Sequence, residues 1–396
     1  MSPVAVASLR SRCLRGFLPV CLLALLWSGW VQAQEPDDPA LPGAYEVGYR
    51  LTEATDTSRD RDVGGRTLPL HIWYPASTVE DYPQASYLSG GFFKLPALLA
   101  RGEAPLLDDR RWPLLVFSHG FGGTPTQSTP LLETLASHGF VVVAVDHIGN
   151  SQTPSPLLKD PAQAAADRVP DISFAIDTLL GWAQDSLSIW YRAVDPFRIG
   201  VTGHSFGGST AMGMAVGEFG GASVDPRVKA ILPVSGVMDV FSDSALSQVP
   251  VPLLLLGGSL DTSVPIANNI RAFDLNQGLQ PAWNVAIEGA THTHFANICA
   301  IADGLFALGL ELEDWPGIEA AELIDPWLQT CAPNSFPIAE AQRLQNLYSV
   351  AFFKLHLNGD GRYMRFLTPL YEQLNEPAIA LQRKALPAWV AEYKVW

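Results

Sequence analysis

A serine flanked by glycines two residues before and two residues after it is the pattern in this chain that could do covalent chemistry. The stretch Gly203-His-Ser-Phe-Gly207 follows a short apolar run, residues 199–202, and precedes a small-residue helical pattern, residues 210–215. A strained turn between strand and helix exposes a serine hydroxyl only if the residues around it are small enough for a close approach. The pattern therefore predicts Ser205 as a nucleophile.

A serine hydroxyl is a weak nucleophile near neutral pH, so it needs a base and a group that orients the base. Asp261 and His292 each follow the end of an apolar strand pattern, and the chain order Ser, Asp, His suits this strand-turn-helix arrangement. We expect Asp261 to orient His292, and His292 to act as the base. Two alternatives stay open, because His294 lies two residues further on and Asp239 follows an earlier strand.

A glycine-rich segment after another apolar strand supplies a candidate for charge stabilisation. Gly120-Phe-Gly-Gly123 allows backbone amides to turn toward a ligand. We predict an oxyanion hole made by the amides of Phe121 and Phe206, where each preorganised donor contributes about 3–4 kcal/mol. The two phenylalanine side chains would form apolar walls for an acyl or alkyl group.

Strand patterns alternate with helix patterns along the chain and predict the elements that position these residues. We expect buried strands at 112–120, 140–145, 199–202, 228–234, 251–256 and 283–287. Helices are expected at 127–138, from Pro170 to 183, at 206–215 and at 266–276. A short strand is expected near 45–51, an antiparallel strand at 68–74, and a loop with short helical pieces at 77–111. This order predicts an α/β fold, a mostly parallel, doubly wound sheet with helices on both faces.

The first 33 residues have the composition of a secretory signal peptide. Three arginines precede an apolar run, residues 17–30, which ends in Val31-Gln-Ala33. A membrane anchor is the alternative, but the run is short for a span. Without this segment the formal net charge changes from −15 to −18, which disfavours nucleic acid and anionic membranes as partners. We therefore expect a secreted or periplasmic protein without a stable membrane span.

Two cysteines, Cys299 and Cys331, remain after the predicted signal peptide. In an oxidising compartment they are expected to form one disulfide, whereas buried free thiols are the alternative. A closed loop of 32 residues would stabilise the chain by about 3–4 kcal/mol in the chain-entropy description. Serine chemistry of the expected kind needs neither a metal ion nor an organic cofactor.

The motifs resemble two groups of known proteins. The segments 114–123, 135–140 and 203–208 resemble the platelet-activating-factor acetylhydrolase and dienelactone-hydrolase-like branch of the α/β hydrolases. The segments 251–265, 289–295 and 348–366 look like the bacterial cutinase and polyester hydrolase group. The resemblance implies an α/β hydrolase fold and a serine carboxylic ester hydrolase that forms an acyl-enzyme on a small-molecule, lipid or polymer ester. Alternatives are a phospholipid acetylhydrolase, a cutin-type depolymerase, an amidase and a non-catalytic binding protein.

The chain departs from these families in two places. Residues 232–235 offer no carboxylate where the acetylhydrolases place their acid, which favours Asp261, and Ser205 excludes the cysteine chemistry of dienelactone hydrolases. Residues 298–339 form an insertion between the histidine loop and the last long helix, expected at 341–357, and carry both remaining cysteines. We expect residues 34–396 to form one domain whose insertion overhangs the acyl pocket. The oligomeric state is not predicted.

Overall fold

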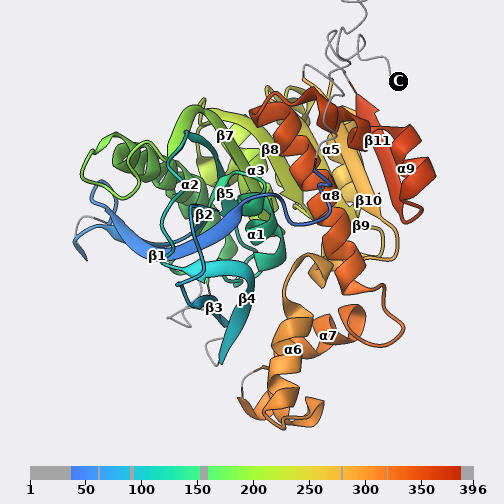
Figure 1. Ribbon diagram of the computed structural model, residues 1–396. Helices are drawn as coiled ribbons and strands as arrows, with labels where there is room; N and C mark the ends of the chain where they lie inside the picture. The colour runs from blue at the N-terminus through green and yellow to red at the C-terminus, as the bar shows by residue number, and fades with distance from the viewer. Residues whose placement is uncertain are drawn as a thin grey trace, which may run out of the picture. The chain divides into compact units, whose positions relative to one another are not determined.

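The apolar runs of the sequence form a sheet whose central strands are parallel (Figure 1). The computed structural model describes residues 37–60, 63–89, 93–151, 159–277, 280–318 and 320–384, which belong to one compact unit, Pro36–Trp396. The predicted signal peptide, residues 1–33, lies outside the described residues.

Within the described chain the sheet has 11 strands in the order β11-β10-β9-β8-β7-β5-β6-β2-β1-β4-β3. The strands that pair in parallel in the centre are β5 (Trp112–Ser118), β6 (Val141–Val145), β7 (Val194–His204), β8 (Val228–Val234), β9 (Leu253–Gly258) and β10 (Ala282–Ile287). Antiparallel pairing joins β1 (Glu46–Asp56) to β2 (Arg66–Ala76), β2 to β6, and β10 to β11 (Ile379–Lys384).

Helices cover both faces of the sheet, as the order of elements predicts. Leu115 and Phe117 of β5 pack in the core under α1 (Thr129–Ser137) and α8 (Ile338–Leu357). The alternate residues of the same strand face the core under α2 (Pro161–Gln184), α3 (Phe206–Val216) and α5 (Ala267–Leu275). Alternation along a strand buried on both sides explains its unbroken apolar sequence. The α/β fold class is therefore confirmed.

The prediction of a loop at 77–111 is wrong. This segment contains β3 (Gln84–Ser89) and β4 (Phe93–Gly102), which pair with each other. Amides of β4 are satisfied by a side chain from α1. The buried carboxylate of Glu133 accepts hydrogen bonds from the amides of Leu98 (3.2 Å) and Ala100 (3.0 Å) and from that of Leu99. A partner more than thirty residues away leaves no trace in the local pattern.

The helix expected from Pro170 begins nine residues earlier, at Pro161. The side chain of Asp160 caps it by accepting hydrogen bonds from the amides of Ala162 and Gln163, each 3.0 Å long. Both prolines suit a first helical turn, and the capping aspartate decides between them. Pro170 then lies inside α2, where it removes one backbone hydrogen bond.

The insertion, residues 298–339, is mainly helical and has an apolar cluster of its own. It contains α6 (Ile298–Ala307), a 3-10 segment (Leu312–Ile318) and α7 (Ile324–Thr330), and its cluster surrounds the fully buried Trp315. A disulfide joins Cys299 and Cys331, whose Cα atoms lie 5.5 Å apart. In the part of the chain that the structure describes, no helix combines the length and apolar character that a membrane span requires.

Most histidines of the described chain are held neutral by the fold. Burial lowers the pKa to about 4 for His71, His138, His147 and His356, and to about 3 for His204. Burial also lowers the pKa of His119 and His294. These side chains are therefore uncharged at neutral pH, and protonating them would disturb the packed interior.

The buried histidines predict that the protein loses stability in mild acid. Below a pKa of about 6.5 the unfolded chain binds protons that the folded state excludes until its lower pKa. The free energy of unfolding should therefore fall by roughly 1 kcal/mol per pH unit for each group as pH drops from about 6.5 toward 4. Urea unfolding at a series of pH values measures this slope.

A variant of His356 provides the control. His356 packs against Trp283 and Phe352, and its Nε2 atom has no partner among the described residues. His356→Leu removes one titrating group and should make the pH dependence shallower by about one proton. An unchanged slope in this variant, or constant stability between pH 6.5 and 5, would contradict the prediction.

Candidate active site

The turn between β7 and α3 presents Ser205 in a strained conformation. Its φ of 58° and ψ of −120° lie in a region that residues with a side chain rarely adopt. A Cβ atom on Gly203 or Gly207 would collide with the carbonyl oxygen of Ser118 at the end of β5. The two glycines are therefore required by the close approach of strand and helix, as the sequence predicts.

Asp261 and His292 meet at the carboxyl ends of β9 and β10. Nδ1–H of His292 donates to Oδ2 of Asp261 over 2.7 Å, while Oδ1 accepts hydrogen bonds from the amides of Ser263 (2.9 Å) and Val264 (2.8 Å). Burial alone would raise the pKa of the Asp261 carboxyl, but these hydrogen bonds outweigh it and lower the pKa. The carboxylate thus stays ionised and fixes Nε2 of His292 as the unprotonated nitrogen.

The two alternatives left open by the sequence occupy different environments. Asp239 is exposed, and its carboxylate lies 3.8 Å from Arg271. His294 is fully buried: its Nδ1 accepts from the amide of Thr291 (2.9 Å), and its Nε2–H donates to the carbonyl oxygen of Phe336 (2.9 Å). His294 therefore ties the histidine loop to the insertion, and both of its ring nitrogens are occupied.

A cavity of about 250 Å³ opens over the serine. Ser205 and His292 line it together with the glycine loop 120–124 and, from the insertion, Ile298, Ile301, Leu323 and Pro326. A larger hollow of about 420 Å³ lies between α2 and residues 222–227, but no histidine lines it. The smaller cavity is therefore the one that combines a nucleophile with a base.

The glycine loop lies directly against the nucleophile. A Cβ atom placed on Gly120 would be 3.5 Å from Cβ of Ser205, and the rings of Phe121 and Phe206 meet edge to face at 5.6 Å. Neither the Phe121 amide nor the Phe206 amide donates a hydrogen bond to another described residue. Two unused backbone donors beside a serine hydroxyl suit a developing oxyanion.

The hydroxyl of Ser205 itself makes no hydrogen bond with a described residue. The shared cavity nevertheless holds the imidazole of His292, whose ring centroid lies 4.6 Å from that of His204, the residue before the serine. Catalytic hydrogen bonds are often long before substrate binds. Rotation of the Ser205 side chain toward Nε2 of His292 would complete a series of hydrogen bonds from Ser205 through His292 to Asp261.

A hydrogen-bond chain links the glycine loop, the serine turn and the histidine loop. The amide of Gly120 donates to Oε1 of Gln127 (3.0 Å), and Nε2–H of Gln127 donates to Nδ1 of His204 (2.9 Å). Nε2–H of His204 then donates to the carbonyl oxygen of His292 (2.9 Å). The side chains of Gln127 and His204 thereby connect the glycine loop, the serine turn and the histidine loop.

The remaining histidines near the site are structural. Nδ1–H of His119 donates to the carbonyl oxygen of Gly120 over 2.7 Å and so helps to hold the glycine loop. His147 is fully buried and bonds Ser118 and Asp171. The described residues contain no group of three or more His, Cys, Asp or Glu side chains that could hold a metal ion.

Sequence reasoning missed two residues at the site. The sequence predicts Gln127 only as the start of a helix, and it assigns no role to Arg168, which precedes the helix start expected at Pro170. Neither belongs to a motif with a fixed spacing, and each acts through a contact with a distant segment. Arginine is rarely buried in proteins, so a buried arginine indicates a special role, but only the structure shows that Arg168 is buried.

The fold and the site define an α/β hydrolase with the arrangement of a serine ester hydrolase, and comparisons with known proteins agree. A family described as platelet-activating factor acetylhydrolase, isoform II, matches residues 91–194. Cutinase 1 from Thermobifida cellulosilytica is 26% identical over 264 residues, 66% of this chain and 75% of that protein. The platelet-activating factor acetylhydrolase of Canis lupus familiaris is 26% identical over 316 residues, 64% of this chain and 67% of the relative.

A solved structure is similar over a longer range. A ferulic acid esterase from Streptomyces cinnamoneus superimposes with a TM-score of 0.65 and 25% sequence identity, covering 87% of this chain and 98% of the other. These relatives all act on carboxylic esters by name. The chain is a carboxylic ester hydrolase of the α/β hydrolase fold, similar to the acetylhydrolases and the cutinases.

Exchanging two aspartates tests which carboxylate serves the site. Asp261→Asn should lower kcat about 10²–10⁴-fold, because an amide favours the wrong tautomer of His292. Asp239→Asn removes an equal charge from the surface and should leave kcat unchanged. Steady-state hydrolysis of nitrophenyl acetate measures both. A large loss in the Asp239 variant with normal activity in the Asp261 variant would reverse the assignment.

Proposed function

We propose that the protein hydrolyses carboxylic esters through an acyl-enzyme on Ser205. Oγ attacks the ester carbonyl carbon while Nε2 of His292 takes the hydroxyl proton, and the carbonyl oxygen becomes an oxyanion. As the tetrahedral intermediate collapses, His292 gives this proton to the leaving alcohol. Asp261 orients the imidazole and stabilises its protonated form.

Water completes the cycle by the same groups in reverse. His292 takes a proton from a water molecule, whose oxygen attacks the acyl carbon, and the second tetrahedral intermediate expels Ser205 with that proton. The acid product leaves and the enzyme is restored. In both intermediates the amides of Phe121 and Phe206 bind the oxyanion. All the steps use protein groups and water.

A single observation carries the proposal: a serine held at positive φ opens on the same cavity as a histidine that bonds a buried, ionised aspartate. Backbone strain of this kind persists only where surrounding contacts enforce it, and it gathers at functional sites. The ester hydrolases among the relatives support the same chemistry.

Removing the serine hydroxyl is the direct experiment. Ser205→Ala should reduce ester hydrolysis at least 10³-fold and abolish covalent labelling by a fluorophosphonate probe. Ser244→Ala, an exposed serine of the helix Asp243–Ser247, should behave like the unmodified protein. Mass spectrometry of the labelled protein locates the adduct. Full activity or labelling in the Ser205 variant would refute the proposal.

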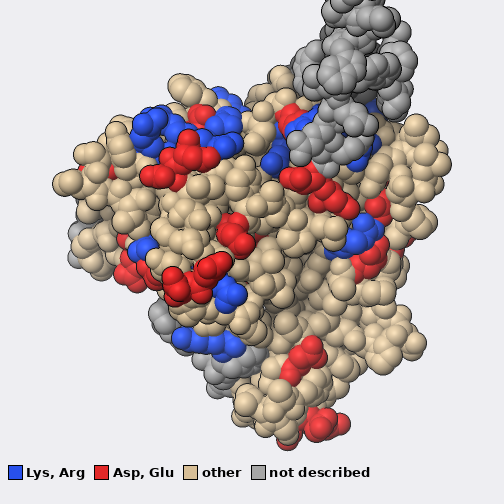
Figure 2. All heavy atoms as spheres, in the orientation of Figure 1, with Lys and Arg blue, Asp and Glu red and all other residues tan. Residues whose placement is uncertain are grey.

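We further propose that the insertion selects small, neutral esters. Ile298, Ile301 and Leu323 provide an apolar wall that limits the cavity to about 250 Å³. Residues 298–339 contain seven acidic and no basic residues, and Figure 2 shows only acidic charges on the surface of α6 and α7. Such a surface repels anionic substrates and anionic lipid surfaces.

Shortening a side chain of this apolar wall should let the cavity accept longer acyl groups. Ile301→Ala or Leu323→Ala should raise kcat/KM for nitrophenyl octanoate relative to the acetate about 3–10-fold, because the missing methyl groups leave room for a longer chain. Leu308→Ala changes an exposed leucine of the same insertion and is the matched control. If the octanoate-to-acetate ratio of kcat/KM is unchanged in both cavity variants, the insertion does not determine which acyl groups are accepted. Release of soluble products from a polyester film, measured with the same variants, tests polymer substrates.

We also propose export from the cytoplasm, either to the periplasm or outside the cell. The proposal rests on the signal-peptide pattern of residues 1–33 and on the disulfide between Cys299 and Cys331. Without residues 1–33 the formal net charge is −18, which disfavours nucleic acid as a partner.

A further inference from the structure

Arg168 of α2 is a fully buried guanidinium whose hydrogen bonds go to the glycine loop. Nη1 donates to the carbonyl oxygen of His119 (2.5 Å) and to Oγ of Ser118 (3.0 Å), and Nη2 donates to the carbonyl oxygen of Gly120 (2.9 Å). Nε donates to Oδ1 of Asn150 over 2.8 Å. No carboxylate of the described chain lies within salt-bridge distance of this charge. A buried cation bound mainly by neutral oxygens is costly and needs an explanation.

The bond to Gly120 controls the direction of the Phe121 amide. The carbonyl of Gly120 and the N–H of Phe121 belong to one planar trans peptide, so they point in opposite directions. Nη2 of Arg168, Nδ1–H of His119 and the amide of Gly123 (3.1 Å) all donate to this carbonyl oxygen. The Phe121 N–H therefore points away from Arg168 and keeps no partner among the described residues. This amide is one of the two expected oxyanion donors.

A second contact joins Arg168 to the other donor. The guanidinium carbon lies 5.0 Å from the centre of the Phe206 ring, and the amide of Phe206 begins α3 beside Ser205. A cation over an aromatic face is attracted by the ring. The same positive charge thus contacts the carbonyl of the peptide that carries one donor and the ring of the residue that carries the other, and it favours negative charge in the cavity.

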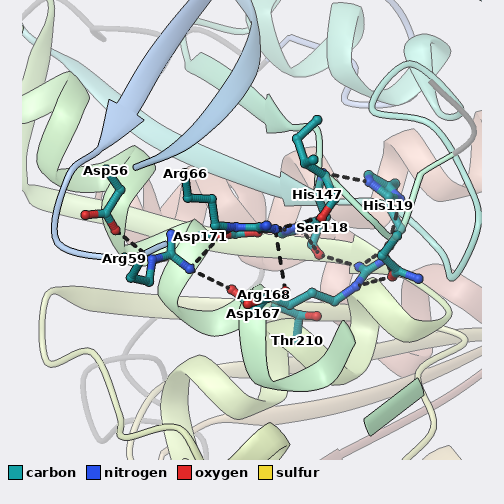
Figure 3. Close-up of polar contacts among 12 residues, drawn as sticks. Asp56, Arg59, Arg66, Ser118, His119, His147, Asp167, Arg168, Asp171 and Thr210 are labelled. Atoms are coloured by element: carbon teal, nitrogen blue, oxygen red, sulfur yellow. Dashed lines mark hydrogen bonds and ion pairs between the residues drawn. The ribbon is translucent and has the colours of Figure 1, made fainter. Parts of the chain in front are cut away.

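A buried relay fixes Arg168 (Figure 3). Its bond to Ser118 continues through Ser118 Oγ–H, which donates to Nε2 of His147 (2.9 Å), and through Nδ1–H of His147, which donates to Oδ2 of Asp171 (2.9 Å). Asp171 also accepts hydrogen bonds from Nε and Nη2 of Arg66, at 2.8 and 2.9 Å. All of these side chains are buried, so this second series of serine, histidine and aspartate is closed to substrate.

The protonation states agree with this direction of bonding. Burial lowers the pKa of His147 to about 4, so the neutral ring can accept from Ser118 while donating to Asp171. Burial would raise the pKa of Asp171, but Arg66 and His147 outweigh it and lower the pKa, so the carboxylate is ionised. Burial also lowers the pKa of Arg168, but a guanidinium starts so basic that it stays charged at neutral pH.

We propose that Arg168 is a positioning residue of the oxyanion hole: it aims the Phe121 amide at the reacting oxygen and, through its charge on the Gly120 carbonyl, strengthens that amide as a donor. Hydrogen bonds in series polarise one another, so a charged donor on the carbonyl makes the N–H of the same peptide more positive. The inference rests on the proposed function, because it assigns a purpose to the same oxyanion site.

Arginine, lysine and methionine at position 168 separate charge, geometry and volume. Removing an interaction that is made only with the transition state lowers kcat and leaves KM unchanged. Arg168→Met should lower kcat about 100–1,000-fold with KM within threefold, and Arg168→Lys should fall between this variant and the original protein. The inhibition constant of a trifluoromethyl ketone, which forms a tetrahedral adduct on serine, should rise in proportion to the loss of kcat/KM.

Controls distinguish positioning from stability and from failure of the proposed function. Arg343→Met removes a guanidinium of α8 that pairs with Glu340 of the same helix and with Glu376, and it should lower the melting temperature without lowering kcat. Loss of activity in Ser205→Ala, measured in parallel, tests the proposed function separately.

Two results would overturn the inference. One is a folded Arg168→Met protein whose kcat is within threefold of the original, and the other is a loss of kcat without a matching rise in the inhibition constant. If Arg168→Met does not fold, Arg168→Lys and Ser118→Ala decide. Ser118→Ala keeps the charge but removes an oxygen that holds Nη1, so a lower kcat at unchanged KM supports the inference and an unchanged kcat refutes it.

Discussion

The contact between the carbonyl of Ser118 and the backbone of Gly203 and Gly207 is the constraint on which the site depends. It allows β5, β7 and α3 to approach so closely that the intervening serine must adopt a positive φ. The strained backbone of Ser205 persists because packing on both faces of the sheet holds the strand and the helix on either side of it. Ser118 acts twice, since its carbonyl sets the steric limit and its hydroxyl joins the relay beneath the glycine loop.

The site combines this steric constraint with an unusual distribution of buried charge. Each ring nitrogen of His147 and His204 has a hydrogen-bond partner, so these neutral histidines link segments that come from different strands. Two of the buried charges contact the loops of the site, the carboxylate of Asp261 and the guanidinium of Arg168. Asp261 stabilises positive charge on the imidazole, and Arg168 favours negative charge at the substrate oxygen.

The sequence predicted the central sheet because its strands are continuous apolar runs and its turns carry glycine. It also predicted Ser205, Asp261 and His292 as one group, since parallel strands end at the same edge. What it did not predict depends on tertiary partners. Amides of β4, the strand beside the edge strand β3, donate to Glu133 of α1, and the start of α2 depends on its capping residue Asp160. Gln127 and Arg168 gain their meaning only from the backbone groups that the fold brings to them.

The two ends of the insertion lie side by side, because the Cα atoms of Cys299 and Cys331 are 5.5 Å apart. A gap of this size can be bridged by a very short peptide link. The intervening residues pack around Trp315 in a cluster separate from the two cores of the sheet. The residues between the two cysteines thus form a side branch of the chain that contributes no strand to the sheet, so their length and sequence can vary with little effect on strand order while they reshape the wall of the cavity.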